Sequence, residues 1–256
     1  MYKSKKFRVK PWDRLKTEID AVARIRPDIK RIFLADGHAF VLGAEKLERI
    51  LSYCNESFPT LQRITAYATP QNLLNKTVGE MQRLRSLGLA ILYYGVETGD
   101  PELLDRTQKG ATPDEMVEGC LRAQEAGLKL SITVILGLAG REGSLRHARA
   151  TADLLNRIQP RYLSALTLML GGYEEEYRRG MPEEFNFNSP LDDISELKEL
   201  LGHLGTDRCI FRTNHASNYL ALKGTLMKDR HRLLEEIDRA LELPERHLRG
   251  EWMRGL

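Results

Sequence analysis

Cysteine is scarce in this sequence and is never clustered. The 256 residues contain three cysteines, Cys54, Cys120 and Cys209, which lie far apart. No pair has the short spacing of a loop that binds zinc or an iron–sulfur cluster, so we assign no metal ligand. Cys54 and Cys120 fall on the apolar faces of expected helices, which favours buried free thiols. An odd number of cysteines fits a reducing compartment, and we expect a cytoplasmic protein.

Long hydrophobic runs and a strong excess of one charge are also missing. No apolar run approaches the roughly 20 residues that span a bilayer, so we expect no membrane partner. The sequence has 39 Lys and Arg against 36 Asp and Glu, a formal net charge of +3. This small excess does not indicate nucleic-acid binding. The patterns G-x-G-x-x-G and G-x-x-x-x-G-K-[ST] are absent too, which excludes the two common phosphate-binding loops.

What the sequence does contain is a regular alternation of apolar runs and amphipathic segments. Buried strands are predicted at 31–36, 63–68, 89–97, 129–138, 162–170 and 209–213. Helices are expected before, between and after them, including 13–26, 45–58, 144–158, 191–204 and about 228–242. Short links in this order predict right-handed βαβ units, and both a doubly wound sheet and a barrel fit. Residues 171–190 are predicted as a solvated loop, with a lid over a site as the alternative.

Candidate site residues follow the strands, because ligands gather at the C-terminal ends of parallel strands. Glu97 stands out, since it ends an apolar run just before a Thr-Gly pair, where a solvated turn needs no carboxylate. Asp36 fits a turn and a ligand contact equally well. His38 and His147 are interpreted as an ordinary loop histidine and a surface histidine.

Several of these stretches together resemble radical S-adenosylmethionine (radical SAM) enzymes. They are "YYGVETGDPELLDRTQKG", "TVILGL", "RIFLADG" and "YLSALTLML", and the resemblance covers about residues 7–245. It implies an α/β fold, an open partial (β/α) barrel of about six parallel strands with outer helices. It also implies S-adenosylmethionine (SAM) and a 4Fe-4S cluster as cofactors. The implied cofactor-binding residues are Asp36 and Gly37 at the methionyl amino group, Glu97 and Thr98 at the amino acid or ribose, and Ile135, Gly137 and Met169 around the adenine.

The sequence departs from this family at one point. The C-x-x-x-C-x-x-C motif that binds the cluster is absent. In related proteins, sequence like "MYKSKKFRVKPW" follows the last cluster cysteine. The resemblance therefore implies that the first barrel strand and the cluster loop lie upstream of this chain. Residues 1–12 would be the basic loop after the cluster, and 13–256 a single partial-barrel domain. The alternative is a basic N-terminal arm that is complete in itself.

The expected function is the core of a radical SAM enzyme. Such enzymes cleave SAM reductively to a 5′-deoxyadenosyl radical, with an electron donor such as ferredoxin or flavodoxin. The chain as given is expected to be inactive without cluster ligands, its catalytic residues are unassigned, and no motif names a substrate. One alternative is a cluster-free barrel that binds a nucleotide or a partner without catalysis. Another is an unrelated barrel enzyme that uses Asp36, Glu97 and His215 as acid–base groups.

Overall fold

The structure is a computed structural model, and it describes residues 8–35 and 38–255. The chain divides into two compact units. The first comprises Met1–Tyr93 and Arg122–Lys129, and the second comprises Tyr94–Leu121 and Leu130–Leu256. Asp36 and Gly37, two of the predicted site residues, lie outside the described residues.

The strands form one sheet in chain order. They are β1 (Arg31–Leu34), β2 (Arg63–Ala68), β3 (Leu89–Glu97), β4 (Lys129–Leu136), β5 (Tyr162–Thr167), β6 (Ile210–Arg212) and β7 (Lys223–Thr225). The order β1-β2-β3-β4-β5-β6-β7 is linear, so the sheet is open. A doubly wound sheet reverses its order at a switch point. The sequential order therefore decides between the two predicted architectures and confirms the α/β partial barrel.

Strand direction follows the prediction except at the last strand. The pairs β1–β2, β4–β5 and β5–β6 are parallel. The sheet gains a seventh strand that was not predicted, because β7 pairs antiparallel with β6. Its sequence, Lys-Gly-Thr, has no apolar run that could have marked it. The described residues thus hold seven strands where about six were expected.

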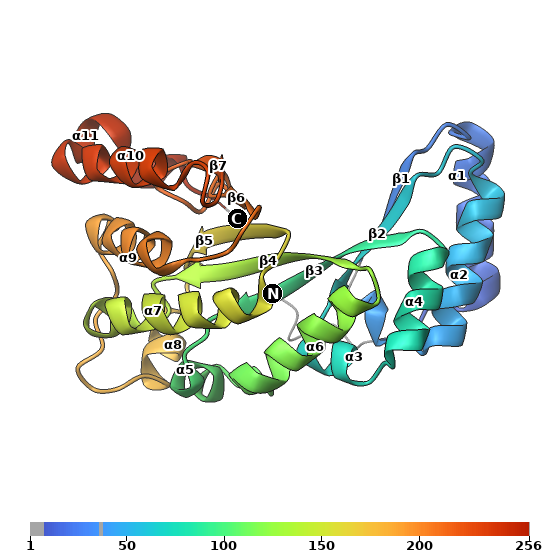
Figure 1. The fold of residues 1–256 in the computed structure, drawn as a ribbon, viewed down its shortest axis with the longest axis horizontal. Coiled ribbons are helices and arrows are strands. Elements are labelled where there is room, and N and C mark those ends of the chain that lie inside the picture. Colours follow the sequence, from blue (N-terminus) through green and yellow to red (C-terminus); the bar gives the residue numbers. More distant parts are fainter. Residues whose placement is uncertain (1–7, 36–37, 256) are drawn as a thin grey trace. The chain divides into compact units, whose positions relative to one another are not determined.

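In the first unit, helices cover one side of the first strands (Figure 1). They are α1 (Trp12–Ile25), the 3-10 turn η1 (Ala39–Val41), α2 (Ala44–Ser57), α3 (Pro70–Leu74) and α4 (Val78–Ser86). A capping box opens α4, where the Thr77 side chain accepts from the Glu80 amide and the Glu80 carboxylate accepts from the Thr77 amide. The buried ammonium of Lys76 donates to the Phe40 carbonyl at 2.6 Å, which ties η1 to the start of α4.

The second unit contains the remaining helices. They are α5 (Pro101–Arg106), most of α6 (Pro113–Glu125), α7 (Gly140–Ile158), α8 (Glu174–Arg179), α9 (Pro190–His203), α10 (Arg230–Glu242), α11 (Pro244–His247) and the 3-10 turn η2 (Glu251–Met253). Helix α9 lies between α7 and α10 (Figure 1). Alternate residues of β4 and β5, such as Ile132, Val134, Leu163 and Ala165, are fully or almost fully buried. The other face of each strand is only partly covered.

Several predicted boundaries are wrong. The fifth strand ends at Thr167 rather than at residue 170. Two other boundaries, on either side of Gly137, are wrong for a physical reason. The fourth strand ends at Leu136, because Gly137 takes a positive φ of 84° that a strand cannot contain. Helix α7 consequently begins at Gly140, before the expected Ser144. The predicted loop at 171–190 contains the short helix α8.

None of the helices in the described part of the chain has the length and apolar character needed to cross a membrane.

Candidate functional site

Glu97 is the last residue of β3 and lies on the half-exposed face of the strand. Side chains alternate along a strand, so Gly95 and Glu97 share one face while the buried Tyr94 and Val96 share the other. Glu97 has a positive φ of 68°, which is uncommon outside glycine and often marks functional turns. Its carboxylate pairs with the Lys109 ammonium at 2.8 Å. Glu97 thus holds a carboxylate at the C-terminal end of the strand, as expected, with a cation beside it.

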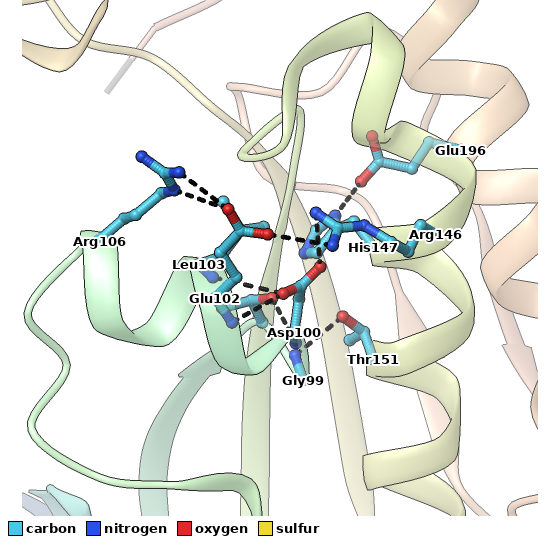
Figure 2. A network of polar contacts seen from close by, with 10 residues as sticks. Gly99, Asp100, Glu102, Leu103, Arg106, Arg146, His147, Thr151 and Glu196 are labelled. Carbon is cyan, nitrogen blue, oxygen red and sulfur yellow. Dashed lines mark hydrogen bonds and ion pairs between the residues drawn. The ribbon is translucent and has the colours of Figure 1, made fainter. Parts of the chain in front are cut away.

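The residues after Glu97 anchor this turn to two helices (Figure 2). The buried Thr98 hydroxyl accepts from the Asp100 amide at 2.9 Å. The Gly99 amide donates to the Thr151 hydroxyl of α7 at 3.0 Å. Asp100 accepts from two amides at the start of α5, and its other oxygen lies 3.3 Å from the Arg146 guanidinium. The Thr98 hydroxyl therefore has a structural partner as well as its predicted ligand role.

A second buried network fixes the turn after β4. The carboxylate of Glu196, on α9, is fully buried. It accepts from the Gly137 amide at 3.1 Å and from the Ser144 hydroxyl at 2.8 Å. It also bonds Nδ1 of His147 at 2.8 Å and Nδ2 of Asn188 at 3.0 Å. His147 is buried, so its interpretation as a surface residue is wrong. The network holds the Gly137 turn between α7 and α9.

Beside this network lies a cavity of about 330 Å³ in the second unit. Its lining includes the predicted residues Gly137 and Met169, together with Asn188 and Asp193. Burial raises the pKa of Asp193 to about 7, although the hydrogen bond from Asn188 lowers it. Ligand sites often have volumes of about 300 Å³ and more, so the cavity can take a single small ring system.

The C-terminal segment lines the same cavity. The Arg254 guanidinium stacks on the Tyr219 ring, 3.9 Å from its centroid. It also donates to the Glu251 carboxylate at 2.8 Å and to the Ser217 carbonyl at 2.7 Å. Tyr219 in turn donates to Glu251 at 2.8 Å. Because Tyr219, Glu251 and Arg254 all line the cavity, residues far along the chain help to shape it.

The remaining predicted residues have defined places. Ile135 lies on the half-buried face of β4, in register with Leu166 of β5. His215 bonds the Ser217 hydroxyl through Nδ1 at 2.9 Å. A larger depression of about 510 Å³, between α5 and the start of α6, includes none of the predicted site residues.

The sequence interpretation missed several residues of the site, including Asn188, Asp193, Glu196 and Arg254. A signal was available for two of them. Asp193 and Glu196 are spaced in phase with Leu197 and Leu200, on the buried face of α9. Acidic residues in phase with a core face indicate a buried polar function rather than a solvated surface.

The three cysteines do not fit a 4Fe-4S cluster. All three are buried and unpaired. Burial raises the pKa of Cys54 to about 11 and the pKa values of Cys120 and Cys209 to about 12. Clusters are held by thiolates, so these thiols are unsuitable ligands. Within residues 8–35 and 38–255, no three or more histidine, cysteine, aspartate or glutamate residues are grouped to hold a metal ion.

Comparison with protein families identifies the fold family. Residues 2–155 match the Radical SAM superfamily, which is more than half of the sequence. The chain belongs to the radical SAM superfamily. Membership of this family implies SAM and a 4Fe-4S cluster as cofactors.

Individual relatives are distant. The heme chaperone HemW of Bacillus subtilis (strain 168) is 22% identical over 154 residues, which are 59% of this chain and 40% of HemW. The radical SAM enzyme coproporphyrinogen III oxidase (HemN) of Escherichia coli has a similar fold, with a TM-score of 0.55 and 16% identity. That likeness covers 76% of this chain and 46% of HemN. Elp3 of Methanocaldococcus infernus, in a form lacking residues 1–46, has a TM-score of 0.57 and 15% identity over 93% of this chain and 60% of that truncated chain.

The similar regions make up only part of each relative. The chain spans less than half the length of HemW and of HemN. At these identities the solved structures share the fold with this radical SAM chain, and they do not assign it a reaction.

Proposed function

We propose that this chain forms the SAM-binding part of a radical SAM enzyme. One observation carries the proposal: the cavity at the ends of β4 and β5 is lined by Gly137 and Met169, which the resemblance assigns to the adenine. Family membership supports the same assignment. Adenine needs a flat apolar slot with a few polar groups at its edge, and this cavity offers both.

Each end of SAM has candidate partners in the second unit. Ile135, Gly137 and Met169 would border the adenine. Glu97 would attract the positively charged methionyl or sulfonium part, because its carboxylate lies on the half-exposed face of β3. Thr98 adjoins Glu97 and would contribute at the ribose or amino acid. Asp36 and Gly37 are proposed to contact the methionyl amino group.

The reductive step of the family is not assigned to residues of this chain. A cluster needs thiolates, and the three buried cysteines do not supply them. We propose that any cluster of the full protein takes its ligands from residues outside this sequence. An electron donor such as ferredoxin or flavodoxin and a location in the cytoplasm belong to the same proposal. HemW is a heme chaperone and HemN acts on coproporphyrinogen III, so tetrapyrroles are the substrate class to test first.

The test is direct binding of S-adenosylhomocysteine, a SAM analogue without the sulfonium charge. Calorimetry with this chain should show saturable binding at one site, and the variant Gly137→Val should lose it. A valine at Gly137 would be strained at φ 84° and would crowd Asp193, whose carboxylate oxygen lies 3.0 Å from a β-carbon placed there. Gly127→Val is the control. Its φ of 81° is close to that of Gly137, and the nearest atom to a β-carbon placed there belongs to the flexible Arg85 side chain, at 3.7 Å. Gly127 lies in the first unit and does not line this cavity, so both variants carry a similar backbone strain but only one changes the site. Absence of binding by the parent chain would overturn the proposal.

The second candidate function is a cluster-free barrel that binds a nucleotide or a partner without catalysis. The burial of all three thiols favours it. Anaerobic reconstitution with iron and sulfide separates the two candidates when it is done on the longest natural form of the protein. A stable cluster, with thiolate-to-iron absorbance near ~400 nm, supports the enzyme. Nucleoside binding without any cluster in that form supports the scaffold.

A further inference from the structure

The cavity beside Gly137 presents hydrogen-bond acceptors that have no donors. Oδ1 of Asn188 is buried and has no hydrogen-bond partner. Asp193 is 4% exposed. Within the described residues its carboxylate accepts one hydrogen bond, from Asn188 to Oδ1. Buried polar atoms without partners are rare in folded proteins, and each one needs an explanation. The Asn188 oxygen is such an atom, and beside it on the same cavity the Asp193 carboxylate accepts only that single bond from Asn188 in the described part of the chain. Together they indicate a ligand that brings donors.

The orientation of the Asn188 amide is fixed by its neighbours. Its Nδ2 donates to the Asp193 carboxylate at 2.9 Å and to the Glu196 carboxylate at 3.0 Å. A flipped amide would set its carbonyl oxygen against two carboxylates, which is unfavourable. The unpartnered atom is therefore the carbonyl oxygen, an acceptor.

The chemistry of the lining also excludes two ligand classes. Among the described residues that line the cavity, the one guanidinium belongs to Arg254, which is engaged with Glu251, Tyr219 and the Ser217 carbonyl. A phosphate or carboxylate would therefore meet Asp193 and Glu174 without a free cation. A metal ion is not favoured either, because no suitable group of ligands occurs in the described ranges. Apolar walls from Leu168, Met169 and Phe187 suit a flat ring instead.

We propose that Asn188 and Asp193 recognise the exocyclic amino group of adenine and make this site selective for adenine over oxopurines. The inference rests on the proposed function, and it assigns base recognition to α9 and the residue just before it. An amino group has two N–H donors, which match the Asn188 carbonyl and the free oxygen of the Asp193 carboxylate. Hypoxanthine has an oxygen at the same position, which would face two acceptors.

The size of the discrimination follows from this mismatch. A site built to hydrogen-bond one group rejects an analogue that leaves its buried polar atoms unpaired far more strongly than an apolar pocket does. Above its pKa of about 7 the Asp193 carboxyl is ionised and can only accept, so selectivity is expected to be greatest near pH 8. The charged and ionisable groups that interact with it are Glu196, Arg254, Asp192 and Tyr219.

The experiment compares S-adenosylhomocysteine with its hypoxanthine analogue, S-inosylhomocysteine, at pH 8. Calorimetry on the whole chain should show at least tenfold tighter binding of the adenine compound. Asp193→Asn keeps the shape and can place a donor in the cavity, so it should lower that preference at least tenfold. Asp153→Asn is the matched control, because Asp153 is exposed on α7. A thermal melt of each variant verifies that it is folded.

The outcomes separate the two proposals. Equal binding of both compounds by the parent chain, or an unchanged preference in folded Asp193→Asn, overturns the role of Asn188 and Asp193. The proposed SAM-binding function would survive either result. If neither compound binds the parent chain, the proposed function fails and this inference fails with it.

Discussion

Asp193 illustrates how a single buried carboxyl group couples the site to pH. Burial raises its pKa from an ordinary value of 3.8 to about 7. Between these values the unfolded chain has released the proton while the folded chain still binds it. The stabilisation from the neutral carboxyl is therefore complete below pH ~4 and is lost as the pH rises through about 7. Each unit of pKa shift corresponds to about 1.4 kcal/mol.

Asp193→Asn should remove this pH dependence, because the amide does not ionise. We expect the free energy of unfolding of the variant, relative to the parent chain, to rise by about 2–3 kcal/mol between pH 5 and pH 8. Urea unfolding at the two pH values measures it. Asp153→Asn should show no such rise. A constant difference between variant and parent would mean that Asp193 ionises normally in the folded chain.

Glu97 offers a second test on a single side chain. Glu97→Ala should weaken SAM binding by about 1.5–3 kcal/mol, roughly tenfold or more, because a charge-assisted contact is lost. S-adenosylhomocysteine lacks the sulfonium charge. If Glu97 contacts that charge, Glu97→Ala should weaken the binding of S-adenosylhomocysteine less than it weakens the binding of SAM. Glu183→Ala, in the exposed loop after α8, is the control. Equal SAM affinity in Glu97→Ala and the parent chain would remove Glu97 from the site.

The sequence could predict the part of the site that follows strands. Glu97 ends an apolar run, which indicated it, and the family resemblance indicated Gly137 and Met169, which line the cavity. Asp193 and Glu196 escaped because acidic residues on an amphipathic helix are usually solvated. Arg254 could not be found, since its contact with Tyr219 joins segments that no local pattern connects.

At the scale of elements, the turn from β3 to α5 is tightly packed against α7. A β-carbon placed on Gly99 would lie 2.3 Å from the Ala150 carbonyl oxygen and 2.8 Å from the Thr151 α-carbon. Both are backbone atoms, so α7 would have to move. The same turn is held by Asp100, which caps α5 and pairs with Arg146 (Figure 2).

Gly99→Ala should therefore destabilise the chain by about 1–3 kcal/mol or more, as overpacking does. Gly79→Ala is the matched control. Nothing lies within 4 Å of a β-carbon at Gly79, which is in helix α4. That change should stabilise the chain by up to about 1 kcal/mol. Urea unfolding measures both, and similar stabilities in the two variants would show that the turn is not tightly packed.

Helices and strands with a regular pattern of apolar residues were predictable from the sequence, and those without such a pattern were not. The strands at 63–68 and 89–97 have the bounds expected from their apolar runs, and the capping residue Thr77 marks the start of α4. The short β7 and α8 carry no periodic apolar pattern, because pairing with β6 and side-chain contacts define them. Local propensity gives no signal in such cases.

At the scale of the whole molecule, the linear strand order leaves β1 at an edge of the sheet. Within the described residues, β1 pairs with β2 alone. Phe33, at the middle of β1, is 38% exposed and packs edge-on against Tyr67 at 4.8 Å between ring centroids. An edge with free backbone groups and an exposed aromatic side chain is a template for pairing with another copy of the chain.

We therefore expect the isolated chain to self-associate through β1, and a charge on that strand to reduce it. Phe33→Lys places a lysine on the edge, as natural sheets do to prevent edge pairing. It should lower the associated fraction in sedimentation velocity, and loss of the aromatic contacts should reduce stability by only about 1 kcal/mol. Val41→Lys is the control, since Val41 is 47% exposed but lies in η1, outside any strand. A parent chain that stays monomeric at high concentration would show that β1 is protected, and an equal effect of Val41→Lys would indicate a general effect of charge rather than strand pairing.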